Sequence, residues 1–172
     1  EFDEVTASQF KNAISELNKE GMEGLVIDLR DNPGGLLDVT CEMLDRMIKK
    51  GLLVYTVDKN GKRVDEDATD SDSFDKPVAI LVNGNSASAS EVFSGAMKDY
   101  KAATLVGTRT FGKGIVQSIV PFGDGTAMKV TVSKYYTPNG VNIHGTGSEP
   151  DVVVELSKDA TKNGKYDRKY DN

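Results

Sequence analysis

Cysteine is almost missing from this sequence: Cys41 is the single thiol among 172 residues. One cysteine excludes an intrachain disulfide and a cysteine-rich metal site. The neighbours of Cys41 are typical of a thiol buried on a helix. We therefore expect Cys41 to be structural.

Long apolar runs and basic clusters are also missing. No stretch of 18 apolar residues occurs, and the N-terminus lacks the order of a signal peptide, so we expect no membrane insertion by this chain. The formal net charge is −6, with 27 acidic residues scattered along the chain. The sequence offers no basic stripe to a phosphate backbone, which argues against nucleic acid as a partner.

The length and the 38% apolar content allow one buried core. We predict a single domain over residues 1–157 and a charged, flexible tail over residues 158–172. The chain starts at Glu1 without a Met and soon enters a helical pattern. Such a start is typical of a processed or excised domain.

Two strand–turn–helix units recur along the chain. Short, β-branched runs predict buried strands, each followed by a small polar or glycine-rich turn and then by apolar residues at helical spacing. The first unit covers residues 24–30, 31–35 and 36–50, and the second covers residues 78–82, 83–91 and 92–100.

The rest of the chain mixes one more helix with β-structure. A capping-box pattern at Thr6 predicts a helix that ends before Gly21. Further strands are expected at residues 104–107 and 152–154. Hairpins are expected at residues 52–64 and 115–136, with an acidic, solvated loop at residues 65–75.

The second turn carries a candidate nucleophile. Open α/β sheets commonly place catalysis where buried strands end, and here Ser86, Ser88 and Ser90 alternate with alanine, which leaves a hydroxyl accessible. Ser88 also precedes Glu91 by three residues, so helix capping is the structural alternative. The two roles are compatible, because amides at a helix N-terminus can stabilise an oxyanion beside a nucleophile.

A serine nucleophile needs a base, and the sequence offers two candidates. The only histidine, His144, lies in a glycine-bounded loop with no feature of a base, although a Ser–His–Asp triad stays formally possible. Lys113 lies between two glycines, in a stretch from Asp99 to Asp124 that contains no other acid. A lysine becomes a base when its pKa falls from about 10.4 towards about 7 to 8, which burial without a carboxylate achieves.

Gln117 follows Lys113 by four residues. Its side-chain amide could accept a hydrogen bond from the amine and orient it without adding charge. A lysine between glycines is also common in surface turns, so the residues alone leave that alternative open.

Three motifs appear in order: VIDLRDNPGG at residues 26–35, LVNGNSASASE at residues 81–91 and TFGKGIVQ at residues 110–117. Together they resemble the C-terminal-processing peptidases, also called tail-specific proteases. The likeness covers roughly residues 1–155 and leaves the tail without a counterpart.

The resemblance implies a role for each matching position. Ser88 would be the nucleophile, Lys113 the general base and Gln117 the residue that holds the lysine. The backbone amides of Gly34 and Ala89 would form the oxyanion hole. The implied activity is that of a serine endopeptidase that works through an acyl-enzyme.

The implied fold is α/β, similar to the ClpP and crotonase superfamily: a mixed core with repeated strand–turn–helix units and a smaller β-sheet. This matches the local patterns described above. Asp99 matches an acid that some members need for activity, and we interpret it as structural, at a helix end.

Two other functions are weighed against the peptidase hypothesis. A catalytically inactive peptide-binding module of the same fold would have no reason to keep Ser88 and Lys113. A crotonase-like acyl-thioester enzyme would polarise a carbonyl with two amides, but it leaves the set of Ser88, Lys113 and Gln117 unexplained.

The family also implies partners and a location. We expect protein or peptide substrates with accessible apolar C-termini, and a PDZ domain upstream in the full-length protein. Bacterial members act outside the cytoplasm, so we expect an extracytoplasmic location in the cell envelope, the periplasm or the medium.

Overall fold

A computed structural model describes residues 1–69 and 73–156. Its first sheet is parallel, with the strand order β1-β4-β5-β8, and β1 pairs with β4 from Leu25 opposite Val78 to Asp28 opposite Leu81. The strands of this sheet are β1 (Leu25–Asp28), β4 (Val78–Val82), β5 (Thr104–Gly107) and β8 (Val152–Val153).

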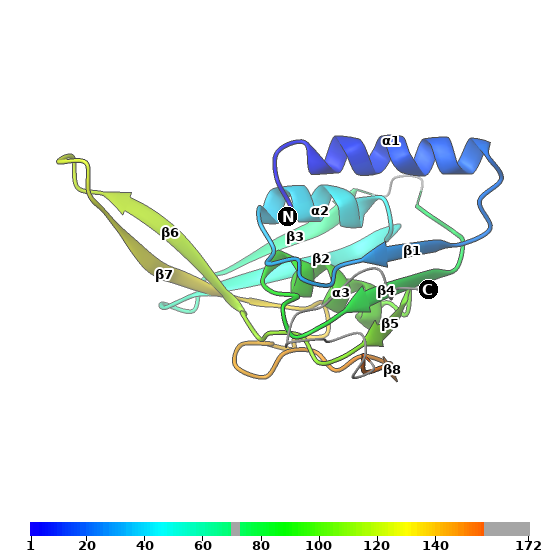
Figure 1. The fold of residues 1–172 in the computed structure, drawn as a ribbon. Coiled ribbons are helices and arrows are strands. Elements are labelled where there is room, and N and C mark those ends of the chain that lie inside the picture. Colours follow the sequence, from blue (N-terminus) through cyan, green and yellow to red (C-terminus); the bar gives the residue numbers. More distant parts are fainter. Residues whose placement is uncertain (70–72, 157–172) are drawn as a thin grey trace.

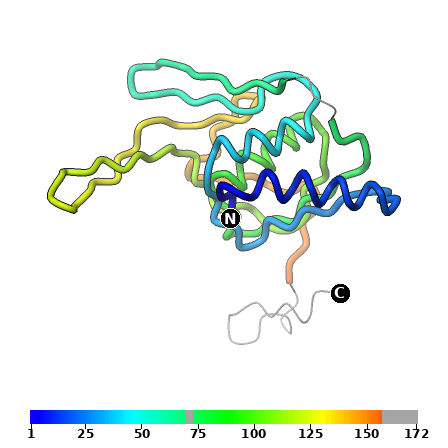
Figure 2. Tube along the Cα trace, turned by 90° about the horizontal axis from the view of Figure 1, so that it is seen from above, coloured from blue at the N-terminus to red at the C-terminus, as the bar shows by residue number. Residues whose placement is uncertain are grey.

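Three helices accompany the parallel sheet (Figures 1 and 2). They are α1 (Thr6–Lys19), α2 (Leu37–Asp45) and α3 (Ala89–Asp99). Helix α1 packs on α2, α2 packs on α3, and both α2 and α3 contact strand β2. We call the parallel sheet and these three helices the α/β body.

The second sheet is antiparallel, with the order β3-β2-β7-β6. Its strands are β2 (Lys50–Asp58), β3 (Arg63–Thr69), β6 (Ile115–Pro121) and β7 (Ala127–Tyr136). Strands β6 and β7 form a hairpin that projects well away from the α/β body (Figure 1). This architecture, one parallel and one antiparallel sheet with helices, confirms the predicted mixed α/β fold.

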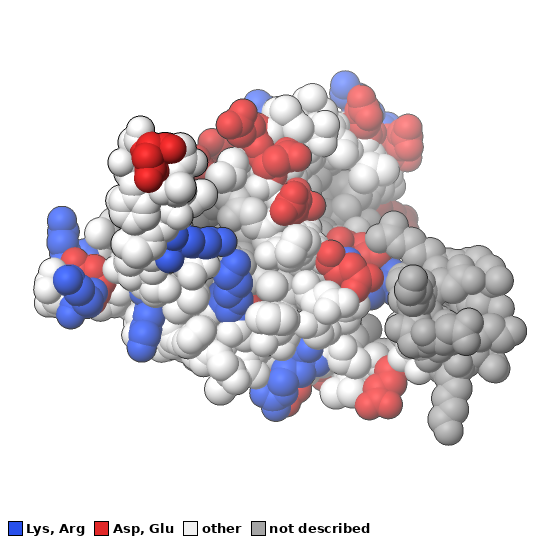
Figure 3. Space-filling view, turned by 60° about the vertical axis from the view of Figure 1, so that its left-hand side comes forward, with Lys and Arg blue, Asp and Glu red and all other residues white. Residues whose placement is uncertain are grey.

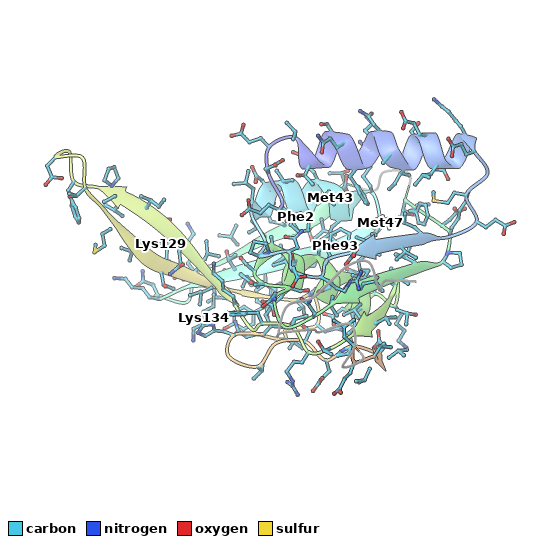
Figure 4. All side chains as sticks on the ribbon, viewed as in Figure 1. Phe2, Met43, Met47, Phe93, Lys129 and Lys134 are labelled. Atoms are coloured by element: carbon cyan, nitrogen blue, oxygen red, sulfur yellow. The ribbon has the colours of Figure 1, made fainter. Side chains whose placement is uncertain are left out.

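The core lies where α2 and α3 meet the sheets. Phe93 of α3 is fully buried, and its ring contacts the rings of Phe2 and Phe10 at centroid distances of 6.1 and 6.4 Å. Met43 and Met47 lie close to Phe2 and Phe93 in Figure 4 and belong to the same core. Burial of these side chains fixes α3, and with it the turn that precedes α3.

Several local predictions were wrong. The first strand is not buried on both faces: it lies at the edge of its sheet, and Val26 is 64% exposed. Thr6 does not cap α1, because Val5 occupies the cap position and the Thr6 hydroxyl donates to Asp3. Helix α2 ends at Asp45 rather than near residue 50.

The expected acidic loop at residues 65–75 is also partly strand. Residues 63–69 pair with β2 as β3, and residues 70–72 lie outside the described part of the chain. The predicted tail at residues 158–172 lies outside the described residues too, so the predicted domain boundary stays a prediction.

Cys41 lies on α2 and is half-buried, close to its predicted placement. Burial raises the pKa of its thiol to about 12, with Glu66 and Asp38 contributing in the same direction. The thiol therefore stays protonated at neutral pH, which makes it a poor nucleophile.

Candidate active site

The turns after β1 and β4 lie side by side because these strands are parallel neighbours. Asn83 and Asp31 exchange hydrogen bonds of 3.1 Å, and the Asn85 side chain donates to Asp31 at 2.8 Å. The Ala87 N–H donates to the Asn32 carbonyl at 3.1 Å. The two glycine- and serine-rich turns therefore form one hydrogen-bonded unit.

Ser88 ends the second turn and occupies the N-cap of α3 with φ 57° and ψ −117°. This is a strained conformation for a residue with a side chain, and such strain persists only where the surroundings enforce it. The predicted capping box with Glu91 is present. The capping position and a place in the wall of a cleft occur together, as the sequence allowed.

Glu91 is fully buried and holds the nucleophile turn against the lysine loop. Its Oε2 accepts the backbone N–H of Ser88 at 2.9 Å and that of Lys113 at 2.8 Å. Its Oε1 accepts the Thr110 hydroxyl at 2.6 Å and the Gly112 N–H at 2.7 Å. Because one oxygen binds both amides, the backbone nitrogens of Ser88 and Lys113 lie within about 6 Å of each other.

A cleft of about 320 Å³ lies beside Ser88. Four of the five predicted site residues line this cleft, from the second turn, from α3 and from the start of the β6–β7 hairpin: Ser88, Ala89, Lys113 and Gln117. Within the described residues, no hydrogen bond joins the Ser88 hydroxyl to the Lys113 amine. The structure thus brings both side chains to one cleft and leaves their direct contact to be tested.

The fifth predicted residue, Gly34, packs against the nucleophile turn. A Cβ on Gly34 would lie 2.8 Å from the Ala89 nitrogen and 2.8 Å from the Ser88 Cβ, so only glycine fits there. The Gly34 N–H already donates to the Asn32 side chain at 3.0 Å. Its neighbour Gly35 lines the cleft, and its N–H has no acceptor among the described residues.

Ala89 is the first residue of α3, so its N–H has no acceptor within the helix. This amide follows Ser88 directly and lines the same cleft. The positive end of the α3 dipole adds to its attraction for negative charge. The arrangement can stabilise an anionic oxygen on a carbon that the Ser88 hydroxyl attacks.

The chain as a whole is similar to known proteins. The model of "Peptidase family S41" matches residues 1–154 of the chain. This chain belongs to peptidase family S41. The match confirms the resemblance stated from the three sequence motifs.

Relatives within family S41 include proteins named "Probable CtpA-like serine protease". One from Staphylococcus aureus (strain N315) is 45% identical over 161 residues, which cover 91% of this chain and 32% of that protein. Another from Staphylococcus epidermidis is 47% identical over 161 residues, covering 91% of this chain and 33% of that protein. The chain therefore spans about a third of the length of these curated relatives.

Solved structures show the same fold. The photosystem II D1 C-terminal processing protease matches with a TM-score of 0.82 and 41% identity, covering 90% of this chain and 40% of that one. Mature CPAF matches with a TM-score of 0.76 at 18% identity, covering 93% of this chain and 45% of that one, which is a likeness of fold alone.

Tyr135 is a cleft residue of this S41 chain to which the sequence assigned no role. It is 3% exposed, lines the cleft and donates its hydroxyl to the Lys113 carbonyl. Burial raises the pKa of its phenol well above its usual value, the Glu91 carboxylate adds to the shift, and the neighbouring Ser88 hydroxyl opposes it. A phenol that stays protonated is a fixed hydrogen-bond donor beside Ser88 and Lys113.

The sequence signals for these contacts differ. Glu91 was found as a capping residue, but nothing in the sequence links its carboxylate to a loop some 20 residues later. Tyr135 lies within the residues that the family likeness covers, although no spacing rule connects it with Lys113.

Two other titratable residues lie away from the cleft. His144 is exposed and does not line it, which gives no support to a triad with Ser88. Asp99 ends α3 and accepts the Asn139 N–H at 2.8 Å, in keeping with the structural role predicted for it.

The described residues contain no cluster of three or more His, Cys, Asp or Glu side chains placed to bind a metal ion. Within the same part of the chain, no helix has both the length and the apolar content that a membrane span requires.

Proposed function

We propose that this protein is a serine endopeptidase of the C-terminal-processing type, in which Ser88 is the nucleophile and Lys113 its base. The observation that supports this most directly is the shared carboxylate of Glu91, which binds the backbone of both residues. Their side chains line one cleft beside the free amide end of α3.

The proposed reaction has two halves. Neutral Lys113 takes the proton of the Ser88 hydroxyl as its oxygen attacks the peptide carbonyl carbon. The resulting ammonium gives that proton to the leaving amine as the C–N bond breaks. Water then attacks the acyl ester, with Lys113 taking its proton, and release of the carboxylic acid restores Ser88. No metal or organic cofactor takes part.

The oxyanion would be held by backbone amides, as the family resemblance implies for Gly34 and Ala89. The Ala89 N–H supports this role because it lacks an intrahelical acceptor. To bind the oxyanion, the Gly34 N–H would have to donate to the oxyanion and to the Asn32 side chain at once, or give up its hydrogen bond to Asn32. The adjacent Gly35 N–H, directly in the cleft wall, is a further donor for the same oxygen.

Gln117 would orient the lysine. Its Nε2 lies 3.5 Å from the Thr131 hydroxyl oxygen, a contact across the β6–β7 hairpin. If the amide nitrogen faces Thr131, its Oε1 remains available to accept from the Lys113 amine. The role thus needs no charge near the lysine.

Substrates, partners and location of the whole protein follow from the family. We propose protein or peptide substrates with accessible apolar C-termini, recruited by a PDZ domain upstream. The apolar wall of the cleft, which includes Leu37, Val92 and Ile115, supports acceptance of an apolar residue next to the bond that is cleaved. The proposed location is extracytoplasmic.

Cleavage of an unstructured peptide with an apolar C-terminus, followed by mass spectrometry, tests the proposal. Wild-type protein should give products, whereas Ser88→Ala and Lys113→Ala should give none while keeping the wild-type circular dichroism. Cleavage by either variant at the wild-type rate would show that the dyad is assigned wrongly. A folded wild type that binds peptides and cleaves none would favour an inactive peptide-binding module.

A further inference from the structure

The cleft beside Ser88 is basic, although the chain as a whole is acidic. The formal net charge of the chain is −6, yet the cleft is lined by two lysines, Lys113 and Lys129, and by no Asp or Glu. In Figure 3, several blue side chains lie on the left half of the molecule, together with a few red ones, while most red side chains lie along its top and right. A cleft lined by one sign of charge attracts ligands of the other sign.

Lys129 is the lysine that the proposed chemistry does not use. It lies on β7 opposite Ile119, two residues beyond Thr131, which pairs with Gln117. Because paired residues of neighbouring strands share a face, Lys129 and Thr131 stand on the same face of the hairpin as Gln117, which lines the cleft. It is therefore aligned with the catalytic candidates, further out along the hairpin (Figure 4).

Lys134 provides a comparison on the same strand. It lies five residues further along β7, paired with Ile115, and unlike Lys129 it does not line the cleft. Charged side chains on exposed strands commonly serve solubility. Lys134 fits that simple role, whereas Lys129 adds its charge to a concave site.

Lys129 forms no ion pair within the described residues. Among residues 1–69 and 73–156, no carboxylate forms an ion pair with its ammonium, whereas the cations of Arg30, Arg63, Lys98 and Arg109 all have one. In the proposed mechanism Lys113 exchanges protons with Ser88 and the leaving amine. Lys129 is therefore the cleft lysine that remains to bind an anion.

We propose that Lys129 binds a carboxylate of the peptide substrate and thereby selects substrates with an anion at a set distance from the cleaved bond. This inference rests on the proposed peptidase function and extends it to substrate specificity. The carboxylate is either the C-terminus of the substrate or the side chain of an Asp or Glu.

The geometry sets the distance. Six residues of extended strand from Tyr135 to Lys129 span about 20 Å. A lysine side chain directed back into the cleft covers about 6 Å of this length with its four-carbon stem. The remaining 14 Å or so correspond to about four residues of extended peptide. A terminal carboxylate about four residues beyond the cleaved bond therefore suits removal of a short C-terminal segment.

Two matched peptide pairs test the proposal with the full-length protein. The first pair ends four residues after the cleavable bond, as a free acid or as an amide. The second pair is longer and amidated, with Glu or Gln at that fourth position. Values of kcat/KM are compared for wild type, Lys129→Met and Lys129→Arg, with Lys134→Met as the control from the same strand outside the cleft.

We expect wild type to prefer one anionic peptide over its neutral partner by about fivefold, the scale of a partly exposed ion pair. Lys129→Met should bring that ratio close to one, Lys129→Arg should keep most of it, and Lys134→Met should leave it unchanged. The pair that shows the preference identifies the source of the carboxylate. An equal ratio in wild type and Lys129→Met, or an equal loss in Lys134→Met, would overturn the proposal.

A binding measurement separates this proposal from the peptidase proposal. Fluorescence anisotropy of the same labelled peptides is measured in the Ser88→Ala background, with and without Lys129→Met. A wild type that fails to cleave would refute the proposed function, while a carboxylate preference in binding that depends on Lys129 would still support the subsite. Cleavage without any such preference in rate or binding would refute the subsite alone.

Discussion

The α/β body and the β6–β7 hairpin contribute to one cleft in opposite ways. The body brings Ser88 on a strained turn that is tied to its surroundings by a fully buried carboxylate. The hairpin brings Gln117 and Lys129 on a ribbon whose outer part is exposed, with Ile119 at 72%. The difference suggests that the body fixes the reacting atoms, while the hairpin adjusts orientation and selection of the substrate.

The largest effect is expected when the proposed base of the cleft, to which both regions contribute, is replaced. Lys113→Arg keeps the charge but cannot lose a proton, so kcat should fall at least about a thousandfold with unfolding free energy close to wild type. Peptide turnover and urea unfolding measure the two quantities. Activity within tenfold of wild type would show that Lys113 is not the base.

The next largest effect is expected when the hydrogen bonds of Glu91 in the α/β body are removed. Glu91→Ala leaves three backbone amides and the Thr110 hydroxyl without their acceptor, which should cost about 3 kcal/mol of unfolding free energy. Glu149→Ala is the matched control, because Glu149 is 55% exposed in its ion pair with Arg109 and its loss should cost less than about 1 kcal/mol. If urea unfolding showed equal losses of unfolding free energy in the two variants, Glu91 would not hold the nucleophile turn against the lysine loop.

A smaller effect concerns the place where hairpin and body meet. Tyr135→Phe removes the hydroxyl that binds the Lys113 carbonyl, and should lower kcat about tenfold at a similar KM while costing about 1 kcal/mol of stability. Tyr136→Phe serves as the control, because it removes a hydroxyl from the neighbouring residue, whose ring stacks on Tyr55 at a centroid distance of 4.9 Å. An equal fall of kcat in both variants would show that the Tyr135 hydroxyl has no specific role in the cleft.

The smallest effect is expected when the same substitution, Ile to Val, is made once in each region. Ile80→Val removes a methylene from the fully buried centre of the body and should cost about 1 kcal/mol. Ile119→Val makes the same change on the exposed hairpin and should stay within about 0.5 kcal/mol of wild type. A larger cost at Ile119 in urea unfolding would mean that the hairpin is packed in solution.

In both regions the sequence predicted local elements better than the contacts between them. Short β-branched runs identified β4 and β5, and the spacing of small residues placed Ser88 at the start of a helix, because both depend on local preferences. The exposure of Val26 escaped prediction, since periodicity does not say which strand lies at the edge of a sheet.

Contacts that depend on register could not be predicted either. An irregularity between Val116 and Gln117 shifts the pairing of β6 with β7, and that pairing decides which side chains of β7 face the cleft. The positions of Tyr135 and Lys129 in the cleft follow from it, and no local pattern in the sequence records it. The predicted set Ser88, Lys113 and Gln117 came instead from the residues around each position and from the family motifs.

The single oxygen that binds the amides of Ser88 and Lys113 has a consequence for how the chain can change over generations. A substitution that shifts either loop also moves the other, so mutations on the two sides should not act independently. The second of two loosening changes would harm little more than the first, and repair of one loop alone would restore little. Divergence at this site should therefore proceed through paired replacements, one in each loop.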